Sequence, residues 1–417
     1  MSFHYSNREL HVEEVPITNI MAEFGSPCYI YSLAILQRQW YAFKQLLQNS
    51  QQICYAVKAN SNLAILANLA KWGAGFDIVS GGELARVMQA GGDVKKTVFS
   101  GVGKTSEEIK TALQANIGCF NVESPSELLR IEAIAKDLHK LANIALRINP
   151  NIDAKTHPYI TTGLKETKFG MSANDALTLY RHAATSQYLK IQGISCHLGS
   201  QLTTLDPFLQ AIEQLLDLTE QLEKENIVLK TINLGGGLGV PYQQEKVPTP
   251  QEYCQQILGA LKKRNATLQL IIEPGRIITA QAGILVTKVE YLKTNSDKNF
   301  AIVDAGMNDL IRPALYHAEQ NIFPIIQRCD LPEKNYDVVG PICENSDFLG
   351  KTRPLLIQAG DFLAIMDSGA YGFSMSSNYN SRPRATEVLV DKNQRFLIRS
   401  RETLEQLWQN EKLLSTN

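Results

Sequence analysis

The sequence predicts an α/β protein in which a (β/α)8 barrel of the TIM type is followed by a mostly antiparallel β domain. Short apolar, β-branched runs alternate with helical segments through eight repeats in the first part of the chain. Eight strand-then-helix repeats over roughly 250 residues are typical of this barrel. After Arg276 the helical crossovers largely disappear and β-rich runs dominate. A doubly wound parallel sheet is the alternative for the first part.

The elements of the barrel follow from hydrophobic spacing. A first short strand is expected at 28–31, and residues 33–48 carry apolar side chains at the spacing of one helix face. The same spacing predicts helices at 62–71, 124–140 and 208–225. The eight predicted barrel strands are 53–59, 75–80, 97–101, 119–123, 143–149, 191–198, 231–234 and 268–273.

A second domain is expected because the later β-rich runs have few helices between them. A short closing helix is predicted near 402–412. We therefore place the barrel at residues 27–276 and assign residues 1–26 with 277–417 to a β domain that the N-terminal segment completes. Its predicted strands are 284–292, 300–305, 337–339, 361–367, 387–390 and 395–401.

Composition and charge exclude several classes of function. Lys and Arg total 41 against 42 for Asp and Glu, so the chain has no excess charge with which to hold nucleic acid or an anionic membrane. The N-terminal residues have neither a basic start nor a continuous apolar stretch, and no segment looks long and apolar enough to span a bilayer. The seven cysteines are scattered and never form a CxxC pair, which favours reduced thiols over disulfides or zinc. These features predict a cytoplasmic protein.

Polar groups gather at the ends of all eight predicted strands, which is where barrel active sites lie. A single polar residue there could be a turn or a cap, but the coincidence across eight strands indicates a binding or catalytic site. The strand ends carry Lys58, 77–80, Ser100, Glu123, Arg147 with Asn149, 197–200, 235–237 and 273–276.

Three of these strand ends offer groups that could bind or react with a ligand. Lys58 ends an apolar strand, where desolvation favours a neutral, nucleophilic amine, although such a lysine can also reach solvent. The glycines of 235–237 could cradle a phosphate with backbone N–H groups or make a tight turn, and no Lys-Ser or Lys-Thr follows as in a nucleotide P-loop. Glu273 and Arg276 provide a carboxylate and a fork-shaped cation, for a ligand or for a surface turn.

Two other motifs admit both a functional and a structural interpretation. His197 and Ser200 end the sixth strand, but a lone histidine is often structural. Histidines at metal-ligand spacing such as HxH or HExxH are missing, so no metal site is expected. Cys343 and Glu344 pair a thiol with a carboxylate in a loop framed by glycine and proline, although cysteine is commonly an inert filler.

Together these motifs resemble the alanine-racemase-like (fold-type III) pyridoxal-phosphate decarboxylases and, among them, most closely the diaminopimelate decarboxylases. The resemblance covers nearly the whole chain and shows no departure at a functional position. Because the motifs are long, in the right order and rarely found together, the match is specific. The matching stretches are 55–60, 75–83, 157–170, 197–201, 235–239, 273–276, 304–316, 340–347 and 367–384.

The resemblance implies pyridoxal 5'-phosphate as the cofactor and gives residues their roles. Lys58 would hold the cofactor as a Schiff base, Glu273 would bond the pyridine nitrogen, and His197 would stack on the ring. Racemases of this fold place an arginine where Glu273 stands, so the glutamate favours decarboxylation. The other implied cofactor ligands are Ser200, Gly236, Gly237, Pro274, Gly275, Arg276 and Tyr371.

The resemblance also implies a homodimer with an active site shared between subunits. The partner subunit would supply Cys343, which returns a proton to the carbanion, and Glu344, which pairs with the distal ammonium of the substrate. Substrate carboxylates would be held by Arg276, Arg312, Tyr316 and Tyr371. Two guanidinium groups suit a distal carboxylate, which ornithine lacks. The implied reaction converts meso-2,6-diaminopimelate to L-lysine and CO2, the last step of bacterial lysine biosynthesis.

Other functions on the same fold stay open. A decarboxylase for ornithine, arginine or carboxynorspermidine would share Lys58 and the glycine cluster, with an acidic pocket in place of the two arginines. A non-catalytic cofactor-binding relative would lack Lys58, Cys343 or the second domain, and all three are present. An aldolase or a racemase fits Glu273 and Cys343 less well. Residues 157–170 are the candidate segment for closing over the substrate.

Overall fold

The structure, a computed structural model, describes residues 3–47, 51–152, 168–264, 266–296 and 298–414. The chain divides into two compact units. The barrel unit comprises Gln39–Pro241 and Glu245–Ile277, and the sheet unit comprises Met1–Arg38, Tyr242–Gln244 and Ile278–Asn417. Each unit is described in turn.

The barrel unit contains the closed eight-stranded barrel that the sequence predicts. All eight pairs of neighbouring strands are parallel, and the barrel closes where β12 pairs with β5. The (β/α)8 fold class is therefore confirmed, and the doubly wound alternative is wrong. The strands are β5 (Gln52–Ala56), β6 (Gly75–Ile78), β7 (Thr97–Phe99), β8 (Cys119–Val122), β9 (Ala142–Arg147), β10 (Leu189–Ser195), β11 (Thr231–Asn233) and β12 (Gln269–Ile272).

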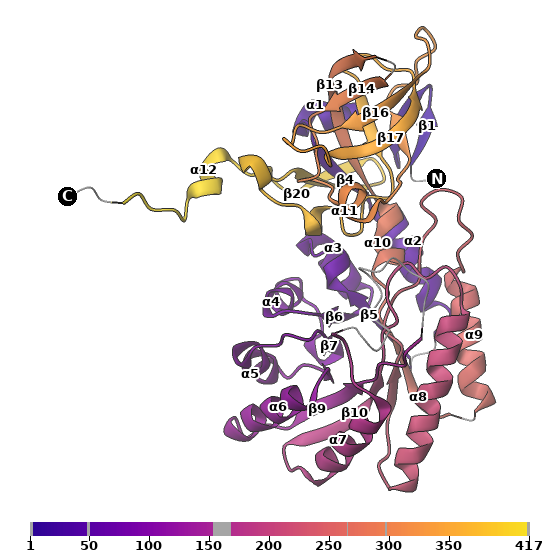
Figure 1. Cartoon of the computed structure of the whole chain (residues 1–417), viewed down its shortest axis with the longest axis vertical. Helices are drawn as coiled ribbons and strands as arrows, with labels where there is room; N and C mark the ends of the chain where they lie inside the picture. The colour runs from indigo at the N-terminus through magenta and orange to yellow at the C-terminus, as the bar shows by residue number, and fades with distance from the viewer. Residues whose placement is uncertain (1–2, 48–50, 153–167, 265, 297, 415–417) are drawn as a thin grey trace. The chain divides into compact units, whose positions relative to one another are not determined.

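Helices α3 to α9 lie outside these strands (Figure 1). Most begin at a Ser, Thr or Asn whose side chain accepts a hydrogen bond from the first turn, as Ser124 does from Glu127 N. Each turns an apolar stripe inward, such as Phe208, Ile212 and Leu215 of α8. The helices are α3 (Leu63–Lys71), α4 (Gly81–Gln89), α5 (Ser106–Ala115), α6 (Pro125–Asp137), α7 (Ala173–Thr185), α8 (Asp206–Lys224) and α9 (Pro250–Lys263), with 3-10 turns at Val57–Ala59 and Val94–Lys96.

The barrel interior changes from apolar to polar along the strands. An apolar cluster is formed by Cys54, Val98, Cys119, Ala145 and Ile271. Side chains two residues apart on a strand point to the same face. The inward residues that come next on four of these strands are Ser100, Asn121, Arg147 and Glu273. The strand periodicity therefore places a polar layer above the apolar one, toward the C-terminal ends of the strands.

The sheet unit is built on a mixed and mostly antiparallel sheet in the order β17-β16-β14-β13-β4-β19-β20, with β18 pairing to β13 and β15 to β18. The parallel pairs are β14 with β16 and β19 with β4. A separate small sheet comprises β1 (Phe3–Ser6), β2 (Glu9–Val12) and β3 (Val15–Pro16). The main strands are β4 (Cys28–Ser32), β13 (Gly283–Asn295), β14 (Lys298–Val303), β15 (Ile322–Pro324), β16 (Lys334–Val339), β17 (Phe348–Leu355), β18 (Phe362–Ile365), β19 (Thr386–Asp391) and β20 (Gln394–Arg399).

Short helices complete this unit, and its N-terminal segment contributes to the core. Leu10, Val12 and Ile17 pack in one cluster with Ile284 and Val388. The helices and 3-10 turns are α1 (Ile17–Phe24), α2 (Leu33–Lys44, which continues into the barrel unit), α10 (Arg276–Thr279), η4 (Ala280–Ala282), α11 (Arg312–Tyr316), η5 (Phe373–Met375), η6 (Tyr379–Ser381) and α12 (Leu404–Trp408).

Two features of the sheet unit differ from the sequence prediction. Strand β4, which we placed at the start of the barrel domain, pairs with β13 and β19, so the N-terminal part of the sheet unit extends to Arg38 rather than residue 26. Strands β15 and β17 were not predicted. Gly350 and Pro354 interrupt the strand pattern of β17, and an edge strand tolerates both.

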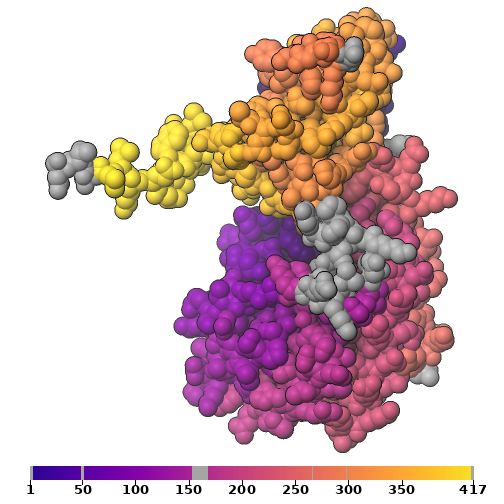
Figure 2. Space-filling view, in the orientation of Figure 1, coloured from indigo at the N-terminus to yellow at the C-terminus, as the bar shows by residue number. Residues whose placement is uncertain are grey.

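The C-terminal segment carries several exposed apolar side chains. It is drawn in yellow in Figure 2 and follows the edge strand β20. Leu404, Trp408, Leu413 and Leu414 are all exposed. Among the residues that the structure describes, no helix combines the length and the hydropathy that a membrane span requires.

Candidate active site

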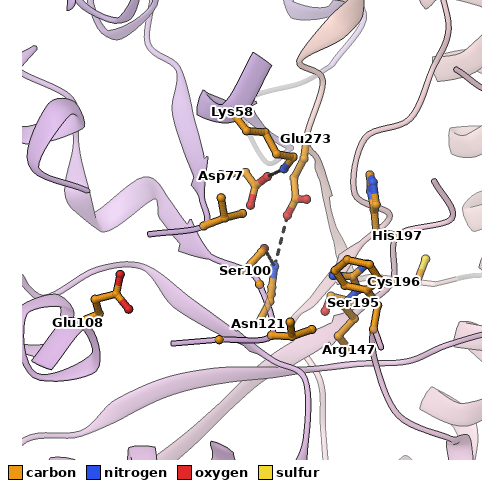
Figure 3. A pocket seen from close by; sticks show the side chains of 15 residues that line it. Lys58, Asp77, Ser100, Glu108, Asn121, Arg147, Ser195, Cys196, His197 and Glu273 are labelled. Atoms are coloured by element: carbon orange, nitrogen blue, oxygen red, sulfur yellow. Dashed lines mark hydrogen bonds and ion pairs between the residues drawn. The ribbon is translucent and has the colours of Figure 1, made fainter. Parts of the chain in front are cut away.

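A cavity of about 430 Å3 opens at the C-terminal ends of the barrel strands (Figure 3). Barrel enzymes place their active sites at this end. The polar side chains that line it come from separate strands or the turns after them, so the cavity gathers residues that are far apart in sequence. They are Lys58, Asp77, Ser100, Glu108, Asn121, Arg147, Ser195, His197 and Glu273.

Lys58 and Asp77 form an ion pair on the wall of this cavity (Figure 3). Lys58 stands in the 3-10 turn after β5, and its Nζ donates a hydrogen bond to Oδ2 of Asp77. The Asp77 side chain is fully buried, whereas the Lys58 side chain is 33% exposed, so the amine remains accessible to a ligand. Oδ1 of Asp77 is buried and has no hydrogen-bond partner among the described residues. A buried carboxylate with an open oxygen can bind a further donor group.

Glu273 follows β12, and its carboxylate is held by two buried amides. Nδ2 of Asn233 donates to Oε1 at 2.6 Å, and Nδ2 of Asn121 donates to the same oxygen at 3.3 Å. Burial, together with the negative charge of Asp77, raises the pKa of Glu273 to about 8, while the charge of Lys58 opposes this rise. The carboxyl group therefore exchanges its proton near neutral pH, unlike an exposed glutamate.

The glycine turn after β11 brings backbone close to both His197 and Glu273. Gly235 and Gly237 have positive φ angles of 66° and 110°, which favour glycine. A Cβ on Gly236 would lie 2.2 Å from the carbonyl oxygen of Glu273, so no side chain fits there. The Gly236 N–H donates to Nδ1 of His197 at 3.1 Å. Burial and the nearby cations Arg147 and Lys58 hold the pKa of His197 well below its usual value, which keeps the imidazole neutral.

The segment from Pro274 to Arg276 joins the last barrel strand to the first. The Pro274 carbonyl accepts a hydrogen bond from Ala56 N at 3.2 Å, and a Cβ on Gly275 would lie 2.9 Å from Cβ of Ala56. Nη2 of Arg276 donates to Oγ of Ser200 at 2.8 Å. The structure thus brings the predicted pair Ser200 and Arg276 together at the mouth of the barrel.

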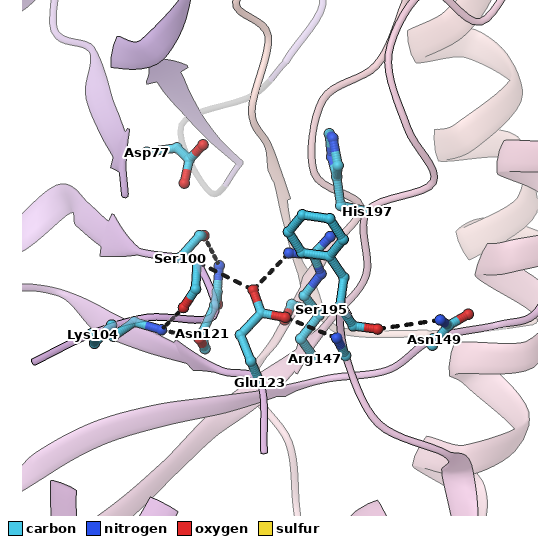
Figure 4. A network of polar contacts seen from close by, with 12 residues as sticks. Asp77, Ser100, Lys104, Asn121, Glu123, Arg147, Asn149, Ser195 and His197 are labelled. Atoms are coloured by element: carbon cyan, nitrogen blue, oxygen red, sulfur yellow. Dashed lines mark hydrogen bonds and ion pairs between the residues drawn. The ribbon is translucent and has the colours of Figure 1, made fainter. Parts of the chain in front are cut away.

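A buried charge network supports the opposite side of the cavity (Figure 4). Arg147 donates to Oε1 of Glu123 at 2.6 Å, and its guanidinium lies 4.9 Å from the centre of the Phe169 ring. Behind it, Lys104 donates to Glu127 at 2.7 Å, and both side chains are nearly inaccessible. Nη2 of Arg147 is buried without a hydrogen-bond partner among the described residues. The network holds a cation at the cavity wall with one donor still to be satisfied.

The remaining predicted residues belong to the sheet unit. Arg312 is buried in α11, with its guanidinium 5.5 Å from the ring centres of both Tyr316 and Tyr242. Tyr371 has a positive φ of 56°, a strained value for a residue with a side chain. Most of the segment 157–170, the candidate closing loop, lies outside the described residues.

Cys343 and Glu344 share an exposed loop of the sheet unit. The Cys343 thiol is exposed, and its backbone N–H donates to Asn380 at 3.2 Å. Glu344 accepts hydrogen bonds from Tyr379 and, at 3.1 Å, from Ser346. The loop therefore presents a thiol and a carboxylate at the surface of its own unit.

Sequence reasoning missed several residues of the cavity. Asp77 and Arg147 were noted at strand ends but received no role, and Asn121 and Asn233 were not singled out as ligands or as supports. The available signal was polarity inside a predicted strand: Asn121 lies two residues after Cys119, and Asn233 lies two residues after Thr231. An inward-facing asparagine in an otherwise apolar strand needs a buried hydrogen-bond partner.

These residues fit the expected pyridoxal phosphate. The accessible amine of Lys58 and the carboxylate of Glu273 line one cavity, as a Schiff-base linkage and a pyridine nitrogen require. The glycine turn and the Arg276–Ser200 pair lie beside them and suit a phosphate. The buried Oδ1 of Asp77 and Nη2 of Arg147 are further polar atoms that a bound group could satisfy.

Comparison with known proteins agrees with this chemistry. Residues 33–280 match the family model described as "Pyridoxal-dependent decarboxylase, pyridoxal binding domain". The diaminopimelate decarboxylase of Haemophilus influenzae is 54% identical over 407 residues, covering 97% of this chain and 98% of the relative. That of Pseudomonas aeruginosa is 50% identical over 414 residues, covering 99% of each chain.

Solved structures agree as well. The diaminopimelate decarboxylase of Helicobacter pylori complexed with L-lysine has a TM-score of 0.91 and 44% identity, covering 95% of this chain and 99% of that one. The enzyme from M. jannaschii in co-complex with L-lysine has a TM-score of 0.94 and 38% identity, covering 99% and 98%. The chain belongs to the pyridoxal-dependent decarboxylase family and, within it, to the diaminopimelate decarboxylases.

Proposed function

We propose that the chain catalyses the pyridoxal-phosphate-dependent decarboxylation of meso-2,6-diaminopimelate to L-lysine and CO2, the last step of bacterial lysine biosynthesis. The observation that carries the proposal is the presence of the Lys58 amine and the buried Glu273 carboxylate in one cavity. The printed function of relatives with 50–54% identity supports the choice of substrate.

Residues of the barrel unit would hold the cofactor. Lys58 is the attachment point, His197 is the neutral ring that stacks on the cofactor, and Glu273 bonds the pyridine nitrogen. Bound pyridoxal phosphate supplies an electron sink for the electron pair that the departing carboxylate leaves behind. Asp77, paired with Lys58, can keep the amine oriented and balance its charge. Ser200, the 236–237 turn and the 274–276 segment are the proposed phosphate side, with Tyr371 as a further ligand.

The substrate side rests on cations and phenols. We assign Arg276, Arg312, Tyr316 and Tyr371 to the carboxylates of the substrate. Arg312 is buried between two tyrosine rings, which holds the guanidinium in a fixed orientation suited to bidentate carboxylate recognition. A substrate with a second carboxylate benefits from these cations, whereas the purely cationic side chain of ornithine would be repelled.

A homodimer would complete each site. Cys343 and Glu344 lie in a loop with an exposed thiol, which is compatible with insertion into a neighbouring subunit. In this proposal the partner's Cys343 returns the proton to the carbon that has lost CO2, and the partner's Glu344 pairs with the distal ammonium. We also propose a cytoplasmic location, on the basis of the N-terminal composition and the scattered cysteines.

The test follows CO2 and L-lysine released by purified protein with pyridoxal phosphate, given meso-diaminopimelate, ornithine, arginine or carboxynorspermidine in parallel. We expect L-lysine from diaminopimelate alone. Lys58→Ala should abolish turnover, whereas Lys288→Ala, which removes an exposed lysine of the sheet unit, should not. Turnover of only a polyamine precursor would contradict the proposed substrate and leave the cofactor chemistry intact.

A mixing experiment tests the shared site. Lys58→Ala and Cys343→Ala subunits are each expected to be inactive or nearly so. If active sites are shared, exchange of subunits creates some sites with both native residues, and part of the activity returns. Activity that stays at the level of the separate variants, after mass spectrometry has verified subunit exchange, would contradict the assignment of Cys343 to the partner.

A further inference from the structure

We propose that Asn233, assisted by Asn121, is a positioning residue that fixes the Glu273 carboxylate so that Oε2 faces the pyridine nitrogen of the cofactor. The inference rests on the role of Glu273 in the proposed function. Both amides donate to Oε1, at 2.6 Å from Asn233 and 3.3 Å from Asn121. No described residue donates a hydrogen bond to Oε2.

The orientation of Asn233 is set by its own second hydrogen bond. Its Oδ1 accepts from the Gly235 backbone N–H at 2.8 Å, so its Nδ2 must point to Glu273. Asn233 is 2% exposed and does not line the cavity, so it acts through Glu273 rather than by touching a ligand. One side chain thereby connects the glycine turn, on the proposed phosphate side, with the carboxylate assigned to the other end of the cofactor.

Asn121 supports the same oxygen from the opposite side of the barrel. Its Nδ2 donates both to Oγ of Ser100 at 2.9 Å and to Oε1 of Glu273 (Figure 3). Asn121 is 3% exposed and stands on β8, whereas Asn233 stands on β11. Two donors from separate strands leave the carboxylate little freedom to rotate.

The two amides also favour the charged form of Glu273. Hydrogen bonds donated to a carboxylate stabilise its anion, which counteracts burial in the barrel. Burial and the charge of Asp77 raise the pKa of this carboxyl, while Lys58, Arg147 and the hydrogen bond from Asn233 lower it. A glutamate that stays ionised can hold a proton on the ring nitrogen, whereas a neutral glutamic acid can only share its own. The amides thus couple the geometry of the site to the protonation of the cofactor.

The test removes one amide at a time in the holoenzyme. Asn233→Leu and Asn121→Leu keep the side-chain size but cannot donate. Asn143→Leu is the matched control, because Asn143 also makes buried-strand hydrogen bonds, to Gly118 and Gln192, outside the cavity. The main readout is the 15N NMR shift of enzyme-bound pyridoxal phosphate labelled at the ring nitrogen, which reports protonation without any substrate.

We expect Asn233→Leu to move the ring nitrogen toward the neutral pyridine shift and to lower kcat about tenfold or more with a smaller change in KM. Asn121→Leu should move both in the same direction but less, because its hydrogen bond is longer. Asn143→Leu should change neither. An unchanged 15N shift in a folded, cofactor-loaded Asn233→Leu enzyme would overturn the inference.

If Asn233→Leu does not fold, Asn121→Leu carries the test, and an unchanged 15N shift there would overturn the paired role. Failure of the proposed function is distinguishable. A wild-type enzyme with no diaminopimelate turnover but a protonated ring nitrogen would reject the substrate and leave the NMR comparison valid.

Discussion

Replacing Glu273 with glutamine should stabilise the cofactor-free protein at alkaline pH. The folded protein raises the pKa of Glu273 from 4.5 to about 8, chiefly by burial. Its protonated form therefore stabilises the fold below about pH 4.5, and this contribution is lost as pH rises through about 8. At roughly 1.4 kcal/mol per pKa unit, the wild type loses up to about 5 kcal/mol relative to Glu273→Gln across this range. Glutamine is neutral throughout and can still accept from the two asparagines.

Urea unfolding of cofactor-free wild type and Glu273→Gln between pH 5.5 and pH 9 measures this difference. Tryptophan fluorescence is suitable because Trp40 and Trp72 belong to the barrel unit. The variant should gain relative stability as pH rises while losing most of its decarboxylase activity. Glu252→Gln is the control, because hydrogen bonds from Thr249 lower the pKa of Glu252 and its stabilising contribution is lost toward acid pH instead. A difference between wild type and Glu273→Gln that does not change with pH would refute the reasoning.

Two further substitutions test the supports of the site. Gly236→Ala should weaken pyridoxal-phosphate binding at least about tenfold, because its Cβ would lie 2.2 Å from the Glu273 carbonyl. Gly259→Ala, in α9 with nothing within 4 Å, should leave binding unchanged, and equal affinities of the two variants by fluorescence titration would contradict this account. Lys104→Met should lower the free energy of unfolding by about 3–5 kcal/mol, since it leaves the buried Glu127 without its cation. Lys288→Met, which breaks an exposed pair with Glu290, should cost less than about 1 kcal/mol in the same urea titration.

The barrel and the chemistry at its strand ends were predictable from local sequence. Each barrel strand is a short apolar run, and Lys58, His197 and Glu273 come directly at or after such runs. Because parallel barrel strands all end on one face, residues at those ends converge whatever their distance in sequence. Periodicity was less informative in the sheet unit. The pairing of β4 with β13 and β19 depends on strands more than 200 residues away, which no local pattern encodes.

The sequence by itself determined which side chains face into the barrel and which of them carry reactive groups. The tertiary structure decided which of these groups meet. Asn121 and Asn233 lie 152 and 40 residues before Glu273, yet they donate to the same carboxylate oxygen. Alternation along a strand specifies the face that a residue occupies, but the stagger and closure of the barrel set its height and neighbours. For this reason the lysine and the glutamate could be recognised as chemical groups from their positions, while the amides that orient the glutamate became visible only in the closed barrel.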